Sequence, residues 1–208
     1  MHTENHVSLP AEPEKSTLEG KNKFLGFWLF LGGETILFAS LFGAYLALRG
    51  EHNGGPGPDH LFSMTVVAIA TLVLLVSSYT SVLAVMAMKN NNFRAMQTWL
   101  FVTVLLGLTF LGLEIFEFYE YYHEGLGYTT SAFSSAFYTL VGFHGGHVLF
   151  GVLWISSLII QNMNVGRINP INAPKFYVSS LYWHFIDVVW IFIFTVVYLQ
   201  GILSGKVG

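Results

Sequence analysis

The sequence of 208 residues contains no cysteine and little charge. Without cysteine the chain forms no disulfide and offers neither a thiolate nucleophile nor a cysteine ligand for zinc or an iron–sulfur cluster. Charged residues make up 10% of the chain, whereas soluble domains contain roughly 25%. The nine Lys and Arg residues form no basic face, and the formal net charge is −3, so we expect no nucleic-acid partner.

Hydrophobic residues are abundant instead. They make up 53% of the chain, aromatic residues make up 16%, and the mean hydropathy is +0.58. Five apolar stretches each exceed the ~20 residues that a helix needs to cross a membrane, and they lie at about 24–48, 61–88, 95–122, 131–161 and 176–203. Clusters of Gly, Pro and Asn separate them. We therefore predict one all-α membrane bundle of five transmembrane helices, from residue 24 to residue 203.

The positive charges favour one orientation of this bundle. Cytoplasmic segments carry an excess of Lys and Arg, and seven of the nine lie in the N-terminal tail or in the second and fourth loops, at Lys15, Lys21, Lys23, Lys89, Arg94, Arg167 and Lys175. We expect the N-terminus inside and the C-terminus outside. Residues 1–23 would then be a polar cytoplasmic tail without a signal-peptide core, and residues 204–208 a short outer tail.

Ionisable side chains at membrane depth are costly and mark functional sites. The first stretch contains Glu34, ~15 Å from an inner end near Phe24 at 1.5 Å per residue. The alternative is a carboxyl group held by local hydrogen bonds, or one that snorkels beside the two preceding glycines. The second stretch has no ionisable side chain, so we expect it to be scaffold that faces lipid or a partner protein.

The third and fourth stretches carry further candidates. Glu114 and Glu117 lie deep in the third, whereas Glu120 and His123 follow at the outer interface, where charge costs little. In the fourth, His144 and His147 share one helix face, beside glycines that permit close helix approach. Depth along the membrane normal brings these histidines nearer to Glu114 than to Glu34, so we predict a His–Glu pair between the third and fourth stretches.

The fifth stretch carries His184 and Asp187, three residues apart. They lie ~12 to 16 Å from the inner end, close to the depth of Glu34, so we expect a second polar contact between the first and fifth stretches. A di-iron bundle would need Glu-x-x-His motifs inside its helices. The chain has one such motif near a span, from Glu120 to His123 at its outer edge, so we expect no metal or haem in this chain.

Four segments closely resemble subunit III of the haem–copper cytochrome oxidases, in its short bacterial form. The last of them reads Tyr-Trp-His-Phe-Ile-Asp-Val-Val-Trp-Ile-Phe, and the four lie at 33–38, 107–118, 137–151 and 182–192. The resemblance covers about residues 23–201. The mitochondrial form has seven helices, and this chain lacks the first two. It also has Glu114 where mitochondrial relatives usually have Gln.

The resemblance implies an accessory, non-catalytic subunit of a proton-pumping terminal oxidase that reduces oxygen to water in the plasma membrane of a respiring bacterium. Haem and copper would lie in partner subunits. This chain would pack on the catalytic subunit I in a complex with subunits II and IV, bind phospholipid, and support proton uptake and the durability of the active site.

Particular residues match the family as well. Glu34 matches its buried carboxylate near subunit I, Glu117 and His147 match polar positions within the bundle, and His184 and Asp187 match its last-helix pair. Three alternatives remain: subunit III of a menaquinol oxidase, a related subunit of a nitric oxide reductase, and a stand-alone proton-coupled transporter that uses Glu34 and Asp187 as relays.

Overall fold

A computed structural model describes residues 12, 15–51, 64–163, 168–169 and 171–201, and over this part of the chain the regular structure is entirely helical. Five helices are long and apolar enough to cross a membrane. They are α1 (Leu18–Leu48), α3 (Met64–Lys89), α4 (Phe93–His123), α5 (Ala132–Asn162) and α6 (Ala173–Ile193), the last continued by the π-helix η2 (Phe194–Leu199). The predicted all-α bundle of five spanning helices is confirmed.

Helix ends differ from the apolar stretches where side chains cap them. α1 begins at Leu18, well before the expected start at residue 24, because the Thr17 hydroxyl accepts a hydrogen bond from the Gly20 amide at 3.0 Å. Residues 18–23 are therefore helical. α5 begins after Ser131, which forms a capping box with Ser134. The expected start of the second stretch, 61–63, and the end of the fifth, 202–203, lie outside the described residues.

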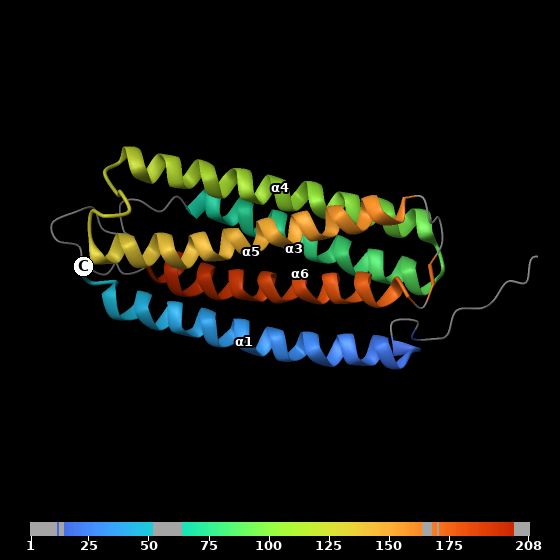
Figure 1. The fold of residues 1–208 in the computed structure, drawn as a ribbon. Helices are drawn as coiled ribbons and strands as arrows, with labels where there is room; N and C mark the ends of the chain where they lie inside the picture. Colours follow the sequence, from blue (N-terminus) through green and yellow to red (C-terminus); the bar gives the residue numbers. More distant parts are fainter. Residues whose placement is uncertain (1–11, 13–14, 52–63, 164–167, 170, 202–208) are drawn as a thin grey trace, which may run out of the picture.

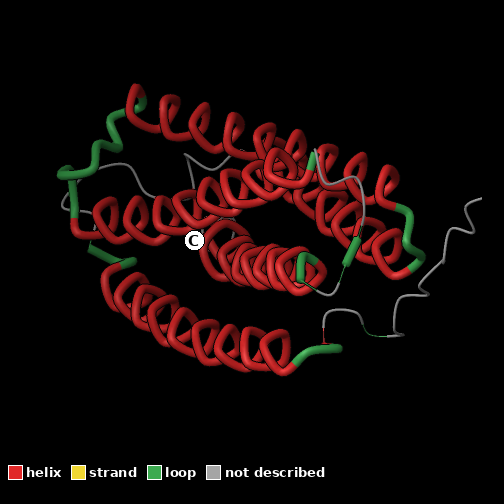
Figure 2. Tube along the Cα trace, turned by 45° about the vertical axis from the view of Figure 1, so that its right-hand side comes forward, coloured by secondary structure: helices red, strands yellow, loops and turns green. Residues whose placement is uncertain are grey.

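Consecutive helices run antiparallel, and α6 lies in the middle of the bundle (Figure 1). It packs against α1, α3 and α5, while α4 packs against α3 and α5. α1 contacts α5 and α6 and forms the edge of the bundle opposite α4 (Figures 1 and 2). This arrangement gives α6 neighbours on several sides, whereas a large part of α1 is open.

Buried aromatic rings fill the space around α6. Trp183 is 0% exposed, and its indole packs between α4 and α5. Two glycines make room for it: a Cβ at Gly107 would lie 2.6 Å from Trp183 Cη2, and one at Gly151 would lie 3.0 Å from the same ring. The indole nitrogen donates to Ser77 Oγ on α3 at 3.0 Å. One side chain of α6 therefore contacts α3, α4 and α5.

Candidate functional site

Glu34 and His147 join α1 to α5. Glu34 Oε2 lies 3.0 Å from His147 Nε2, and the two side chains are 17% and 19% exposed. Phe38 packs on the imidazole, with ring centres 5.0 Å apart. The sequence predicted other partners for both residues. His147 bonds to Glu34 and not to Glu114, and Glu34 bonds to a residue of α5 and not to one of α6.

The hydrogen bonds of His147 fix how many protons this pair holds. Nδ1 lies 2.6 Å from the backbone carbonyl of Phe143, and a carbonyl only accepts, so Nδ1 carries a hydrogen. One further proton must lie between Nε2 and the Glu34 carboxyl group to make their bond. Whether that proton is on nitrogen or on oxygen, the pair has no net charge. A membrane interior tolerates such a pair far better than a lone charge.

A groove lies beside this pair. It has a volume of about 500 Å³ and is lined by Phe30, Gly142, Phe143, Gly146, His147, Phe150 and Tyr182. Gly142 and Gly146 border open space in it, since a Cβ at either position would meet nothing within 4 Å. A second groove of about 360 Å³ shares Phe30 and continues between α1, α5 and α6, where Lys23 and Lys175 line it. Its other walls are mainly apolar.

His144 and Glu114 are both buried where α4 meets α5. His144 is 0% exposed and lies against the rings of Phe110 and Trp190, at 5.8 and 5.2 Å between centres. Glu114 packs on Gly145, where a Cβ would lie 2.5 Å from its carboxyl oxygen. Within the described residues, Glu114 Oε1 and both ring nitrogens of His144 have no hydrogen-bond partner. The predicted His–Glu pair between these helices therefore forms no hydrogen bond among the described residues.

Glu117 is held by two tyrosines. Its carboxyl group is 2% exposed and accepts hydrogen bonds from Tyr121 at 2.8 Å and from Tyr198 at 3.4 Å. Tyr121 is one turn away on α4, whereas Tyr198 belongs to η2. The wider turn of a π-helix changes the direction of the side chains that follow it. Glu117 thus connects α4 to the end of the last helix.

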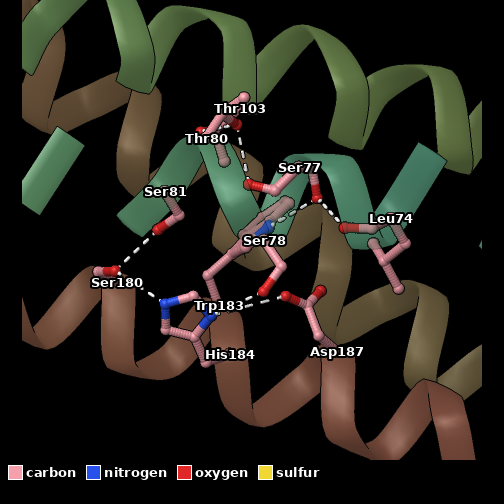
Figure 3. Close-up of polar contacts among 10 residues, drawn as sticks. All are labelled: Leu74, Ser77, Ser78, Thr80, Ser81, Thr103, Ser180, Trp183, His184 and Asp187. Atoms are coloured by element: carbon pink, nitrogen blue, oxygen red, sulfur yellow. Dashed lines mark hydrogen bonds and ion pairs between the residues drawn. The ribbon is translucent and has the colours of Figure 1, made fainter. Parts of the chain in front are cut away.

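The last helix forms a row of hydrogen bonds with α3, as Figure 3 shows for its central part. Ser78 Oγ lies 2.8 Å from His184 Nδ1, and Ser81 Oγ lies 2.7 Å from Ser180 Oγ. The Ser77–Trp183 bond belongs to the same row. About two turns after Trp183 on α6, the Trp190 indole donates to Thr71 Oγ1 on α3 at 3.0 Å. Small polar side chains on α3 therefore meet the polar side of α6 along much of its length.

The second stretch, which we expected to be scaffold, forms most of α3, and α3 supplies several hydrogen-bond partners of α6. One expectation from the sequence is wrong. His184 bonds to α3 and not to Glu34 on α1. Rise per residue gives the depth of a side chain but not its direction around the helix axis. The missed signal was the spacing of Ser77 and Ser81, small residues four apart that favour close helix packing in membranes.

Asp187 lies beside this row of hydrogen bonds but does not take part in it. It is 5% exposed, and Oδ2 lies 3.9 Å from His184 Nδ1. In the part of the chain that the structure describes, neither carboxyl oxygen has a hydrogen-bond partner. No three His, Asp or Glu residues among those described come close enough to share a metal ion. Glu34, Glu117 and His184 form helix-to-helix contacts, and Glu120 and His123 are exposed at the C-terminal end of α4.

Comparison with known proteins identifies the family of this chain. The model of "Cytochrome c oxidase subunit III" matches residues 15–202. Cytochrome c oxidase subunit 3 of Bacillus sp. (strain PS3) is 65% identical over 208 residues, covering 98% of this chain and 100% of the relative. That of Bacillus subtilis (strain 168) is 64% identical over 198 residues, covering 95% of each.

A quinol oxidase relative is more distant. Quinol oxidase subunit 3 of Bacillus subtilis (strain 168) is 45% identical over 202 residues, covering 97% of this chain and 98% of the relative. The resemblance seen in the sequence is therefore confirmed over nearly the whole chain. This multi-pass bacterial membrane protein belongs to the cytochrome c oxidase subunit III family.

Proposed function

We propose that this chain is the non-catalytic subunit III of a proton-pumping cytochrome c oxidase and stabilises the catalytic subunit I. The observation that carries the proposal is full-length similarity at 65% identity to a cytochrome c oxidase subunit 3. The lower identity of 45% to a quinol oxidase subunit favours cytochrome c over menaquinol as electron donor. Haem and copper belong to the partner subunits, and subunits II and IV complete the complex.

The buried polar groups support a structural role. Glu34 joins α1 to α5, Glu117 joins α4 to η2, and His184 joins α6 to α3, each by a hydrogen bond. Such contacts fix the surface that the bundle presents to a partner. We infer that the support given to proton uptake and to the durability of the active site is indirect, through a rigid subunit packed on subunit I.

The two grooves along α1, which share Phe30, suit a bound phospholipid. Their walls are mainly apolar, which fits an acyl chain, and Lys23 and Lys175 line the second groove. In the orientation with the N-terminus inside, these lysines lie at the inner membrane surface, where anionic headgroups attract positive side chains. Native mass spectrometry of the purified complex checks this part of the proposal by detecting the retained lipid.

Purification through a tag on this chain tests the main proposal. We expect the haem- and copper-containing subunit to co-purify, and the complex to consume oxygen with reduced cytochrome c faster than with a menaquinol analogue. Selective removal of this chain should leave haem content and initial turnover unchanged but should shorten the active lifetime during turnover. Loss of haem, or of initial turnover, on removal would contradict a non-catalytic role. A preference for the quinol would point to the quinol oxidase alternative.

The Glu34–His147 pair gives a separate prediction about stability. Glu34→Leu leaves His147 Nε2 without its partner and should lower the temperature at which this subunit leaves the complex, by a loss of about 1–2 kcal/mol. Glu34→Gln keeps a donor for Nε2 and should change that temperature little. The double variant Glu34→Leu, His147→Leu should recover most of the loss, because no polar group is left unpaired.

Heating the complex and following the release of this subunit provides the measurement. Glu120→Gln is the control, since Glu120 is exposed at the end of α4 and should behave like the unsubstituted chain. Equal release temperatures for Glu34→Leu and Glu120→Gln would show that the pair does not hold α1 in place.

A further inference from the structure

Asp187 is a buried acid without a hydrogen bond. It is 5% exposed, and among the described residues neither of its carboxyl oxygens has a hydrogen-bond partner. It follows the start of α6 at Ala173 by fourteen residues, which places it ~21 Å along the helix, within the reach of a hydrocarbon core ~30 Å thick. An ionised carboxylate at this depth is very costly when nothing donates to it. We therefore expect this carboxyl group to hold a proton.

His184 lies between this carboxyl group and a pocket of the bundle. Its Nδ1 lies 3.9 Å from Asp187 Oδ2 and 2.8 Å from the Ser78 hydroxyl, and both side chains of α6 point toward Ser78 (Figure 3). Its Nε2 lies 3.4 Å from the Ser180 hydroxyl. An imidazole can accept a proton on one nitrogen and release a proton from the other. His184 is therefore placed to pass a proton between Ser180 and Asp187.

The pocket between α3 and α6 extends from His184 toward one membrane surface. Its volume is about 170 Å³, and it is lined by Val82, Val85, Tyr177, Ser180, Leu181 and His184. It runs along α6 from the level of Tyr177, ~6 Å from the start of the helix, to that of His184, ~16 Å from it. The ammonium group of Lys89 lies 5.9 Å from the centre of the Tyr177 ring, so a charged side chain marks the shallow end.

This pocket can admit water. A water molecule occupies ~30 Å³ of liquid and needs two to four polar partners when it is enclosed. The pocket has room for several such molecules, and the Ser180 hydroxyl, the His184 imidazole and the Tyr177 hydroxyl are polar groups of its walls. Water at the membrane surface can therefore reach the level of His184, although Asp187 itself does not line the pocket.

The route for a proton ends at Asp187. Farther along α6 the Trp190 indole donates to Thr71, and an indole nitrogen donates but cannot accept, so it cannot pass a proton on. The Trp183 indole likewise only donates, to Ser77. Within the part of the chain that the structure describes, the hydrogen bonds thus connect this carboxyl group to one side of the membrane.

The helices packed on α6 give Asp187 no second ion pair among the described residues. On α3 the ionisable side chain is Lys89, at the far end of the helix. Glu34 on α1 and His147 on α5 bond to each other, and His144 on α5 packs on Trp190. His184 is therefore the basic group that can exchange a proton with this acid.

Glu114 provides a contrast within the same bundle. It is 4% exposed, and its Oε1 also lacks a hydrogen-bond partner in the described ranges. His144, on the facing helix α5, is 0% exposed, and neither of its ring nitrogens is hydrogen-bonded there. Neither residue lines the grooves beside α1 or the α3–α6 pocket. Glu114 is thus as buried as Asp187 but lacks a comparable route to a surface.

We propose that Asp187 is a proton-binding site that exchanges its proton with water at one membrane surface through His184 and the α3–α6 pocket. With the N-terminus inside, this surface is the inner one. On uptake, His184 Nε2 accepts a proton from water, directly or through Ser180, and the proton on Nδ1 passes to Asp187 Oδ2, directly or through Ser78. Release is the reverse, and the imidazole is neutral before and after. This site goes beyond the structural role proposed above.

Infrared spectroscopy of the purified complex tests this site. A protonated carboxyl group gives a carbonyl stretching band that shifts when deuterium replaces its proton. We expect one such band to be lost in Asp187→Asn and another in Glu114→Gln. After transfer of the unsubstituted complex into heavy water, the Asp187 band should shift roughly 100-fold faster or more than the Glu114 band, because a positioned imidazole accelerates proton transfer by this order.

Two substitutions interrupt the route at different points. His184→Asn keeps a hydrogen bond to Ser78 but cannot accept and release a proton, so it should slow the shift of the Asp187 band roughly 100-fold. Val82→Phe fills the pocket and should slow it as well. Leu108→Phe is the matched control, since Leu108 is 48% exposed on α4. The rate at Glu114 should stay unchanged in all three variants, whereas a loosened bundle would accelerate both sites.

Several results would overturn the proposal: no band that depends on Asp187, equal exchange rates at Asp187 and Glu114, or unchanged exchange in His184→Asn. If Asp187→Asn does not assemble, Asp187→Glu identifies the band by moving it instead of removing it. Co-purification of the catalytic subunit decides the proposed function separately, because the infrared band is read whichever subunits this chain retains.

Discussion

Trp183→Ala should lower the stability of the subunit by about 3–5 kcal/mol, since large-to-small changes at buried aromatic positions remove many contacts and leave a cavity. Trp183 is 0% exposed and lies against Gly107 and Gly151, so α4 and α5 both lose contacts. The change also removes the donor to Ser77 on α3. Release of the subunit from the heated complex should shift to a clearly lower temperature.

Trp28→Ala is the matched control for this variant. Trp28 is 51% exposed on α1, and its loss leaves no cavity inside the bundle. Trp183→Phe separates the two contributions, because it keeps most of the ring but loses the indole donor. A release temperature for Trp183→Ala equal to that for Trp28→Ala would show that the centre of the bundle does not depend on this ring.

Gly107→Val should destabilise the subunit by about 1–3 kcal/mol through overpacking. A Cβ at this position would lie 2.6 Å from Trp183 and 2.9 Å from Val152, and both neighbours are buried side chains that have little room to move. Helices α4 and α5 would have to separate. The measurement is again the release temperature, together with the amount of subunit that assembles.

Gly112→Val offers a control on the same helix with the same change of side chain. Nothing lies within 4 Å of a Cβ at Gly112, so the added methyl groups face outward, and valine costs the helix little. Similar losses at both positions would indicate that glycine is needed in α4 for its backbone and not for the approach of Trp183.

The lengths of the apolar runs were enough to predict the five helices. A run of more than ~20 apolar residues has few stable alternatives to a spanning helix, because lipid cannot satisfy free backbone groups. Helix ends were less predictable where a polar cap extends a helix beyond its apolar part. Thr17 does this for α1, which starts in a region that hydropathy alone assigns to the tail.

The candidate residues were identified more reliably than their partners. Glu34, Glu117, His144 and Asp187 are indeed buried or partly buried, because an ionisable group in a long apolar run has few other places to go. Their partners depend on how each helix is rotated, and depth arithmetic does not contain that angle. The search for ionisable residues also left out uncharged hydroxyl groups, such as those of Ser78 and Tyr198, which bond to His184 and Glu117.

The single proton shared by Glu34 and His147 also determines how this pair responds to a membrane potential. The electrostatic energy of one elementary charge that crosses the whole membrane changes by ≈2.3 kcal/mol per 100 mV of membrane potential. A proton that moves ~1 Å between nitrogen and oxygen crosses about a thirtieth of the hydrocarbon core, so the same voltage changes its energy by roughly 0.1 kcal/mol. This contact between α1 and α5 should therefore hold equally well in a resting and in a fully energised membrane.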